Sequence, residues 1–365
     1  MTAGKIPVTI VSGFLGSGKT TLLNRLLNSP PDENSSTDSA ARIVVLVNEL
    51  GAIGLEHTMV RHVKDSVVLL ESGCLCCTVR GQLVDTLREL FLAALHRKIP
   101  VFSRIIIETT GIADPAAISY TLKYERFLSD RYRYDGCISV SDAVFGLRQL
   151  ENEPVAVKQA VLADVLVVSK TDLASPRQLA ELQQSLRDLN PDARQFLAQD
   201  VPGLQQLLRE SSLRTNVART VFRMGSSSGS WLVGGMPPPA PAHGDVRALT
   251  MSWHSPIERP AFLKAMSALF EDDHIDLLRM KGVIWFRGDD KASAFHGVHR
   301  QLYPLVAFEG MAASSDGPQA VAQDGHEELP EGGTSVLVLI FRSANPMELE
   351  CRLTQLLPGG NRESM

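Results

Sequence analysis

Residues 7–20 read PVTIVSGFLGSGKT and decide the fold. An apolar, β-branched run leads into a loop that fits the pattern G-x-x-x-x-G-K-[ST], and a helical pattern follows. Glycines in such a loop let backbone N–H groups surround phosphate oxygens, while the lysine neutralises phosphate charge and the hydroxyl binds Mg²⁺. The alternative is a glycine turn that only caps a helix. The predicted phosphate-contacting residues are Gly13, Gly16, Ser17, Gly18, Lys19, Thr20 and Thr21, with Lys19 also catalytic and Thr20 also a metal ligand.

The first two hundred residues alternate short apolar runs with helical patterns. Such runs suit a parallel sheet that is covered on both faces, so the sequence predicts a doubly wound, mostly parallel α/β domain. Helices are expected after Gly81, where leucines recur at helical spacing up to Leu95, and from Pro176 to Leu189. The predicted strands are Pro7–Val11, Ile43–Val47, Val67–Leu70, Arg104–Ile107, Cys137–Val140 and Val165–Ser169.

A change of composition divides the chain. Residues 224–244 contain GSSSGS and MPPPAPAHG, which is typical of a linker. The expected domains are therefore residues 1–223 and 245–365, and the second is a smaller α+β domain with an antiparallel sheet. Its predicted strands are 246–253, 282–286, 303–308 and 335–341, its predicted helices are 259–270 and 346–357, and loops are expected at 29–41 and 310–333.

Composition excludes several classes of protein. The 365 residues include 36 Lys+Arg and 41 Asp+Glu, and the net charge of −5 gives no general attraction to nucleic acid or anionic membranes. No apolar run approaches the roughly 20 residues that span a bilayer. Five cysteines, three of them within four positions, argue against a secreted disulfide scaffold. The other two, Cys137 and Cys351, are expected to be ordinary buried thiols. We expect a soluble, cytoplasmic protein with no nucleic-acid or membrane partner.

Two motifs follow predicted strands. Ser169-Lys170-Thr-Asp172 resembles the guanine-reading [NST]-K-x-D of GTPases, in which the Asp carboxylate accepts from two guanine N–H groups; a solvated turn is the alternative. Glu108-Thr-Thr-Gly111 places a carboxylate where it can hold Mg²⁺ through water or orient the attacking water, and its glycine lets the loop approach a γ-phosphate. The alternative for this second motif is a helix-capping segment ahead of Asp114, and both roles are compatible.

Cys74-Leu-Cys76-Cys77 is a candidate metal site. Thiolates bind soft or borderline ions, and Gly73 permits the tight turn that adjacent cysteine ligands need. Three sulfurs require a fourth ligand for tetrahedral zinc, which Glu49 or His57 could supply. Buried inert thiols and a redox pair are the alternatives, and His57 could equally be an exposed loop histidine.

These motifs, in this order, resemble the CobW-like metallochaperone GTPases, relatives of the urease and hydrogenase accessory GTPases, with a layout nearest the YjiA-type branch. Asn48-Glu49-Leu-Gly, Trp253-His254-Ser-Pro-Ile and Arg279-Met-Lys281-Gly282 add to the resemblance. It implies GTP hydrolysis coupled to metal delivery, with GTP, Mg²⁺ and Zn²⁺ bound and with cobalt as cargo in the cobalamin branch. It also implies that Arg80 lies on the nucleotide side of the cysteine loop.

Partners and rival functions remain open at this point. We expect a client apo-metalloprotein, and a GTP-dependent homodimer is a further hypothesis; iron is a third candidate cargo. Three features depart from the family pattern: Ala52 replaces an acid, the linker offers only His243 in place of a His-rich stretch, and the 29–41 loop is long. The rival functions are a P-loop small-molecule kinase with structural zinc and a nucleotide-regulated metal or redox sensor.

Overall fold

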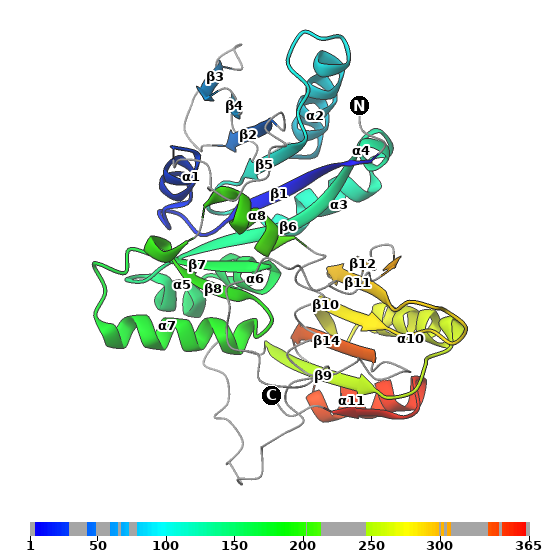
Figure 1. The fold of residues 1–365 in the computed structure, drawn as a ribbon. Coiled ribbons are helices and arrows are strands. Elements are labelled where there is room, and N and C mark those ends of the chain that lie inside the picture. Colours follow the sequence, from blue (N-terminus) through cyan, green and yellow to red (C-terminus); the bar gives the residue numbers. More distant parts are fainter. Residues whose placement is uncertain are drawn as a thin grey trace, which may run out of the picture. The chain divides into compact units, whose positions relative to one another are not determined.

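The computed structural model describes residues 4–28, 42–48, 59–64, 67–72, 79–201, 203–212, 246–298, 301–302, 305–307, 335–342 and 345–362 (Figure 1). The chain divides into two compact units, Met1–Leu213 and Arg214–Met365. The predicted linker, the predicted loops at 29–41 and 310–333 and both predicted domain boundaries fall outside the described residues, and they stay predictions.

The first unit is built on a mostly parallel sheet. Among the described residues its strand order is β3-β4-β2-β5-β1-β6-β7-β8, and every pair is parallel except β3 with β4. This confirms the predicted doubly wound fold class. The strands are β1 (Ile6–Ser12), β2 (Ile43–Asn48), β3 (Met59–Lys64), β4 (Val67–Ser72), β5 (Arg104–Glu108), β6 (Tyr132–Asp142), β7 (Val165–Ser169) and β8 (Arg194–Leu197).

Helices cover both faces of this sheet because alternate strand residues point to opposite sides. Val8 and Ile10 of β1 pack with Leu83 and Leu87 on one face, whereas Val11 packs with residues of α1 and α8 on the other. The helices are α1 (Lys19–Asn28), α2 (Val79–Leu95), α3 (Pro115–Tyr124), α4 (Arg126–Arg131), α5 (Gly146–Asn152), α6 (Pro154–Leu162), α7 (Pro176–Leu189) and α8 (Leu204–Ser211).

Local signals set some boundaries accurately. Helix α7 starts where predicted because Ser175 and Gln178 form a capping box and Pro176 occupies the first helical position. Strand β6 is longer than predicted, since its first residues, Tyr132 to Asp135, include charged side chains that interrupt the apolar run. Strands β3 and β8 were not predicted; both are edge strands, and their sequences MVRHVK and RQFL carry the polar residues that such positions tolerate.

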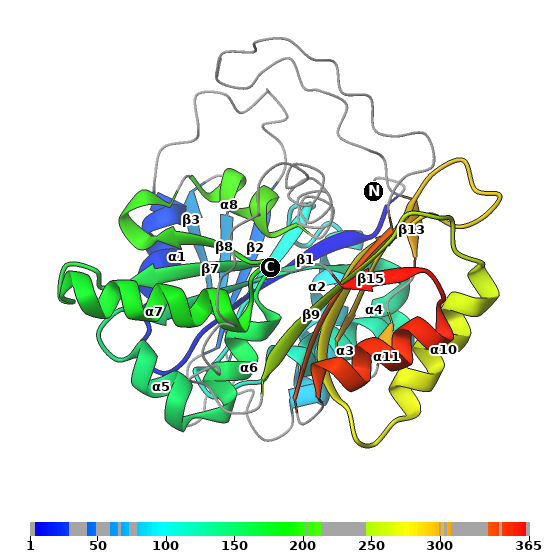
Figure 2. The same cartoon turned by 90° about the horizontal axis from the view of Figure 1, so that it is seen from below.

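The second unit is an antiparallel sheet with two helices packed into one core, as Figure 2 shows for α10 and α11. Its order within the described part of the chain is β12-β11-β10-β14-β9-β15, with β13 paired to β11. The elements are β9 (Arg247–Trp253), α10 (Arg259–Glu271), β10 (Asp276–Ile284), β11 (Ser293–Val298), β12 (Gln301–Leu302), β13 (Val306–Ala307), β14 (Ser335–Arg342), α11 (Pro346–Leu356) and β15 (Gly360–Arg362).

Two strand predictions in this unit were inaccurate. The strand predicted at 282–286 spans Asp276–Ile284, because the charged residues Arg279 and Lys281 interrupt the apolar run ahead of Gly282. The strand predicted at 303–308 is described only as the short β13, and β11 was missed. No helix among the described residues reaches the length and apolarity that crossing a membrane requires.

Candidate functional site

The loops with chemical motifs leave the parallel sheet at one edge. Strands β1, β5, β6 and β7 are parallel neighbours, so their carboxyl ends lie on the same side of the sheet. In open α/β sheets this edge is where ligands bind. The candidate site is therefore assembled from the loops that follow these four strands.

The loop after β1 needs its glycines. Gly13, Gly16 and Gly18 have φ values of +141°, +70° and +88°, which residues with a Cβ rarely adopt. A Cβ on Gly13 would also lie 2.3 Å from the carbonyl oxygen of Val140 on β6. Helix α1 begins directly afterwards at Lys19, so its unpaired N–H groups and positive dipole end meet the loop. Ser17 Oγ is buried with no hydrogen-bond partner in the described structure, which fits a loop shaped to receive phosphate oxygens.

Lys19 is buried at the centre of this loop. Its Nζ donates to the carbonyl oxygens of Gly13 at 2.9 Å and Phe14 at 3.1 Å. Burial lowers the pKa of Lys19 below its ordinary value, and the charge of Glu108 partly offsets that effect. The ammonium is therefore held in the loop by weak neutral acceptors, which an anion would outcompete.

Thr20 and Glu108 meet across the site. Thr20 Oγ1 donates to Glu108 Oε1 at 2.5 Å, and Glu108 is buried at the end of β5. A hydroxyl oxygen and a carboxylate are the hard ligands that Mg²⁺ prefers. The pair could hold Mg²⁺ between them, so the residues present fit the ion expected from the sequence.

The loop after β5 packs on the phosphate loop. Thr109 N–H donates to Val11 O at 2.9 Å, and a Cβ on Gly111 would lie 2.4 Å from the backbone nitrogen of Leu15. Asp114 caps α3 through a hydrogen bond from Ala116 N–H at 2.9 Å. The capping interpretation is thus correct for Asp114, and it leaves Glu108 available for chemistry.

The loop after β7 is tied to the same site. Ser169 Oγ donates to Ser17 O at 2.6 Å, which joins the guanine-type motif to the phosphate loop. Lys170 adopts a left-handed φ of +54°, and its Nζ lies 2.6 Å from Asp142 Oδ2. Asp172 is exposed in the following turn, where a base could reach its carboxylate.

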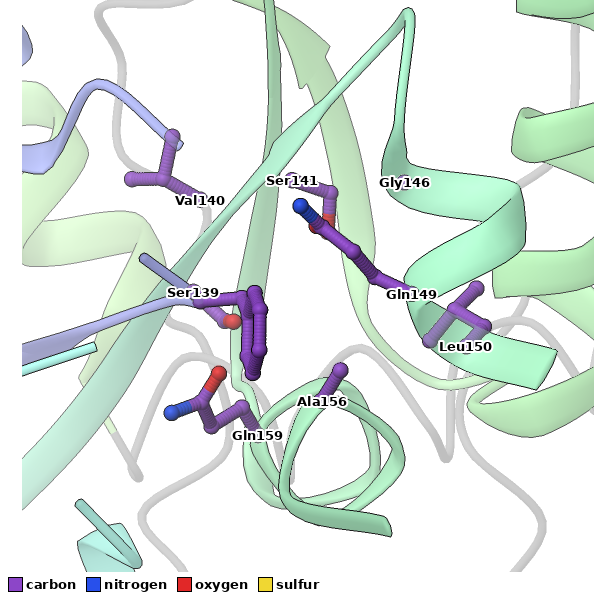
Figure 3. Close-up of a pocket in the computed structure, with 9 residues that line it drawn as sticks. Ser139, Val140, Ser141, Gly146, Gln149, Leu150, Ala156 and Gln159 are labelled. Atoms are coloured by element: carbon purple, nitrogen blue, oxygen red, sulfur yellow. The ribbon is translucent and has the colours of Figure 1, made fainter. Parts of the chain in front are cut away.

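Sequence reasoning missed two residues of this region. Asp142 ends β6, is buried, and accepts the N–H groups of Val144 and Phe145 at 2.8 and 3.3 Å in addition to pairing with Lys170. Its position after a strand was the available signal. Gln159 borders a small hollow behind the phosphate loop together with Gln149 (Figure 3), and no sequence signal marks it within its helix.

The predicted metal ligands Cys74, Cys76, Cys77, Glu49 and His57 lie outside the described residues. Arg80 lies in the first turn of α2, but its side chain is likewise outside the description. The other two cysteines were both expected to be buried. Cys137 is buried in β6, whereas Cys351 is exposed, because it lies on the solvent side of α11. The described residues contain no group of three or more His, Cys, Asp or Glu that could hold a metal.

Comparison with known proteins gives two family matches. Residues 7–197 match the CobW/HypB/UreG nucleotide-binding domain, and residues 246–357 match the cobalamin synthesis protein cobW C-terminal domain. The chain is 30% identical over 298 residues to the zinc chaperone YjiA of Escherichia coli (strain K12), covering 81% of this chain and 86% of that protein.

Two further comparisons agree. A zinc-regulated GTPase metalloprotein activator of Schizosaccharomyces pombe is 34% identical over 196 residues, which cover 52% of this chain and 44% of that protein. The crystal structure of Zn(II)-bound YjiA GTPase from E. coli has the same fold, with a TM-score of 0.67 at 23% identity and coverage of 97% and 99% of the two chains. The chain belongs to the CobW/HypB/UreG family and carries a cobW-type C-terminal domain.

Proposed function

We propose that this protein is a GTP-hydrolysing metallochaperone that binds zinc and transfers it to a client metalloprotein. The observation that carries the proposal is that the phosphate loop, Glu108 and the Ser169–Asp172 loop are joined in one site through the Thr20–Glu108 and Ser17–Ser169 hydrogen bonds. The names of the relatives, a zinc chaperone and a zinc-regulated GTPase activator, support the same function.

The guanine base is recognised by the loop after β7. Asp172 accepts from the guanine N–H groups, and adenine lacks that pair of donors, so ATP leaves the carboxylate unpaired. The aliphatic stem of Lys170 lies along the base while its ammonium is held by Asp142. Because Ser169 bonds to Ser17, base recognition and phosphate recognition share one rigid frame.

Hydrolysis depends on the residues around the phosphates. The ammonium of Lys19 leaves the carbonyl oxygens of Gly13 and Phe14 and neutralises charge on the transferring phosphoryl group. Mg²⁺, when bound by Thr20 and Glu108, supplies further neutralisation of the phosphates. Glu108 orients water at the end of β5, and Gly111 keeps the next loop close to the phosphate loop.

Zinc is the cargo, and strand register supports its coupling to the nucleotide. Val47 of β2 is paired with Glu71 of β4 on one side and with Glu108 of β5 on the other. The segments that begin at Glu49, Gly73 and Thr109 therefore leave the sheet from adjacent strand ends. We assign zinc to Cys74, Cys76 and Cys77, with Glu49 or His57 as further ligands, close enough for γ-phosphate contacts to alter the ligand geometry.

Several finer assignments belong to this proposal. Transfer takes place in the cytoplasm, where thiols stay reduced, and the recipient is an apo-metalloprotein. Arg80, at the start of α2, contacts the nucleotide, and the GTP-bound chain forms a homodimer. Residues 1–223 act as the GTPase domain and residues 245–365 as the C-terminal domain, joined by the 224–244 linker.

Phosphate release from GTP and from ATP, with and without Zn²⁺, tests the proposal. We expect turnover of GTP only, and a zinc effect that is lost in Cys76→Ser and Cys77→Ser. Cys351→Ser is the matched control, because that thiol is exposed on α11 in the other unit. Equal turnover of GTP and ATP would favour the kinase-like or sensor alternatives, and a zinc effect that survives both cysteine substitutions would exclude the assigned metal site.

A further inference from the structure

Gln159 is a buried polar residue to which the proposed function gives no role. It lies on α6 with 1% of its surface exposed. Its side-chain Nε2 donates to two backbone carbonyl oxygens of the loop after β5, those of Gly111 at 3.1 Å and Ala113 at 3.0 Å. Carbonyl oxygens only accept, so the amide nitrogen must face the loop.

The same loop also packs against the phosphate loop. Gly111 packs so closely on Leu15 that an added Cβ would lie 2.4 Å from its nitrogen and 2.6 Å from its Cα. Ala113 N–H closes a turn onto Thr110 O at 3.1 Å. The loop is thus fixed by two contacts, one with the backbone of the phosphate loop and one with the side chain of Gln159.

The hydrogen bonds of Gln159 also set the direction of two backbone N–H groups in the loop. In a planar trans peptide the C=O and the following N–H point in opposite directions. By drawing the carbonyls of Gly111 and Ala113 toward α6, Gln159 turns the N–H groups of Ile112 and Asp114 away from α6. Oriented backbone N–H groups of this kind are suited to stabilising an anion.

The neighbouring ion pair between Lys158 and Asp114 cannot replace the hydrogen bonds of Gln159. Lys158 Nζ lies 3.2 Å from Asp114 Oδ2, but both side chains are about one-third exposed, at 35% and 31%. Solvent screens such a pair, and it holds a side chain rather than the backbone of the loop. Gln159, unlike Lys158, therefore binds the loop backbone directly.

We propose that Gln159 is a positioning residue for GTP hydrolysis, which fixes the backbone of the Gly111–Asp114 loop in the orientation that meets the γ-phosphate. The proposal rests on the GTPase function proposed above. It predicts an effect on turnover and little effect on GDP, since GDP has no γ-phosphate for the loop to meet.

The test compares Gln159→Met with Gln149→Met. Methionine keeps the length of the side chain and removes the donor, and Gln149 borders the same hollow from α5 with no side-chain hydrogen bond to the loop among the described residues (Figure 3). We expect Q159M to lower kcat by about 10- to 100-fold, the effect of misplacing a catalytic contact by about 1 Å. GDP affinity should stay within about twofold, and Q149M should keep both values.

Gln159→Glu gives a second, independent readout. It retains a donor only when protonated, so its rate relative to the unchanged protein should rise as the pH falls. If Q159M does not fold, the pH dependence of Q159E relative to the unchanged protein tests the proposed role of Gln159. An active unchanged protein with an equally active Q159M would overturn this inference and leave the proposed function standing. If Q159M and Q159E each lost GDP affinity as strongly as kcat, the inference would also be overturned, because the role of Gln159 would then be purely structural. Hydrolysis by the unchanged protein tests the proposed function separately.

Discussion

Replacing Gly111 with alanine would place a methyl carbon 2.4 Å from the backbone nitrogen of Leu15. Ordinary contact begins at 3.4 Å, so the two loops must separate by about 1 Å, the difference between those values. The Cα of Leu15, at 2.6 Å, also belongs to the backbone and cannot rotate away as the end of a side chain would. The displacement therefore falls on the two backbones, including the loop that joins Glu108 to α3.

Two magnitudes follow from this displacement. Overpacking of this kind costs about 1–3 kcal/mol of unfolding free energy. A shift of about 1 Å in a group that contacts the transition state costs roughly 100-fold in rate. Gly111 does not need a positive φ, so the effect of alanine is steric and not conformational. We expect kcat for GTP to fall far more than the affinity for GDP, because most of the predicted phosphate contacts lie in the Gly13–Thr21 loop outside Leu15.

The assay is single-turnover GTP hydrolysis, combined with GDP titration and urea unfolding. Gly4→Ala is the matched control, because nothing lies within 4 Å of a Cβ at that position. It should change neither rate nor stability. Wild-type turnover by G111A, at wild-type GDP affinity, would show that the close packing of the two loops has no part in hydrolysis.

Three further predictions concern charged groups of the site. Asp142→Asn should weaken GDP binding about tenfold, or roughly 1.5 kcal/mol, by releasing Lys170, while Asp188→Asn on the exposed face of α7 should have no effect in the same titration. Asp172→Asn should cost about 2–3 kcal/mol of guanine affinity. Competition by ATP measures the selectivity for guanine, and an unchanged selectivity would exclude Asp172 as the residue that recognises guanine. Burial lowers the pKa of Lys19, and phosphate binding needs its charged form, so GDP affinity should decline as pH rises, and the decline should begin at a lower pH than an ordinary lysine would give. Lys19→Arg should flatten that decline, whereas an equal decline in both proteins would exclude Lys19 as its cause.

The sequence predicted the parts of the fold that depend on local patterns. Val165–Ser169 and Pro176–Leu189 were predicted with their observed bounds, since one is an uninterrupted apolar run and the other has a complete capping box. Edge strands β3 and β8 could not be found this way, because their polar residues remove the apolar signal. β3 pairs with β4, which follows it closely in the chain, whereas β8 pairs with β7, more than twenty positions earlier.

In the candidate site, too, local motifs were predicted and residues that depend on distant partners were missed. Lys19, Thr20 and Glu108 were predicted from motifs; Thr20 is hydrogen-bonded to Glu108, and the charge of Glu108 acts on the nearby Lys19. Asp142 and Gln159 were missed because their roles depend on partners 28 and 48 positions away, which no motif spacing encodes. Exposure was the weakest inference, as Cys351 shows, since a thiol on an amphipathic helix can lie on either side.

The most direct test of the account is the zinc affinity of the chain in two nucleotide states, measured at one pH with a chromophoric competitor. Strands β4, β2 and β5 are adjacent, and the cysteines follow β4 in the sequence, so under the proposed function the GTP-analogue state should bind zinc more tightly than the GDP state. Coupling of this type is typically about 5- to 150-fold, and linkage requires zinc to raise GTP affinity by the same factor. Identical zinc affinity in both states, with Cys74, Cys76 and Cys77 intact, would contradict the coupled chaperone mechanism even if both ligands bind.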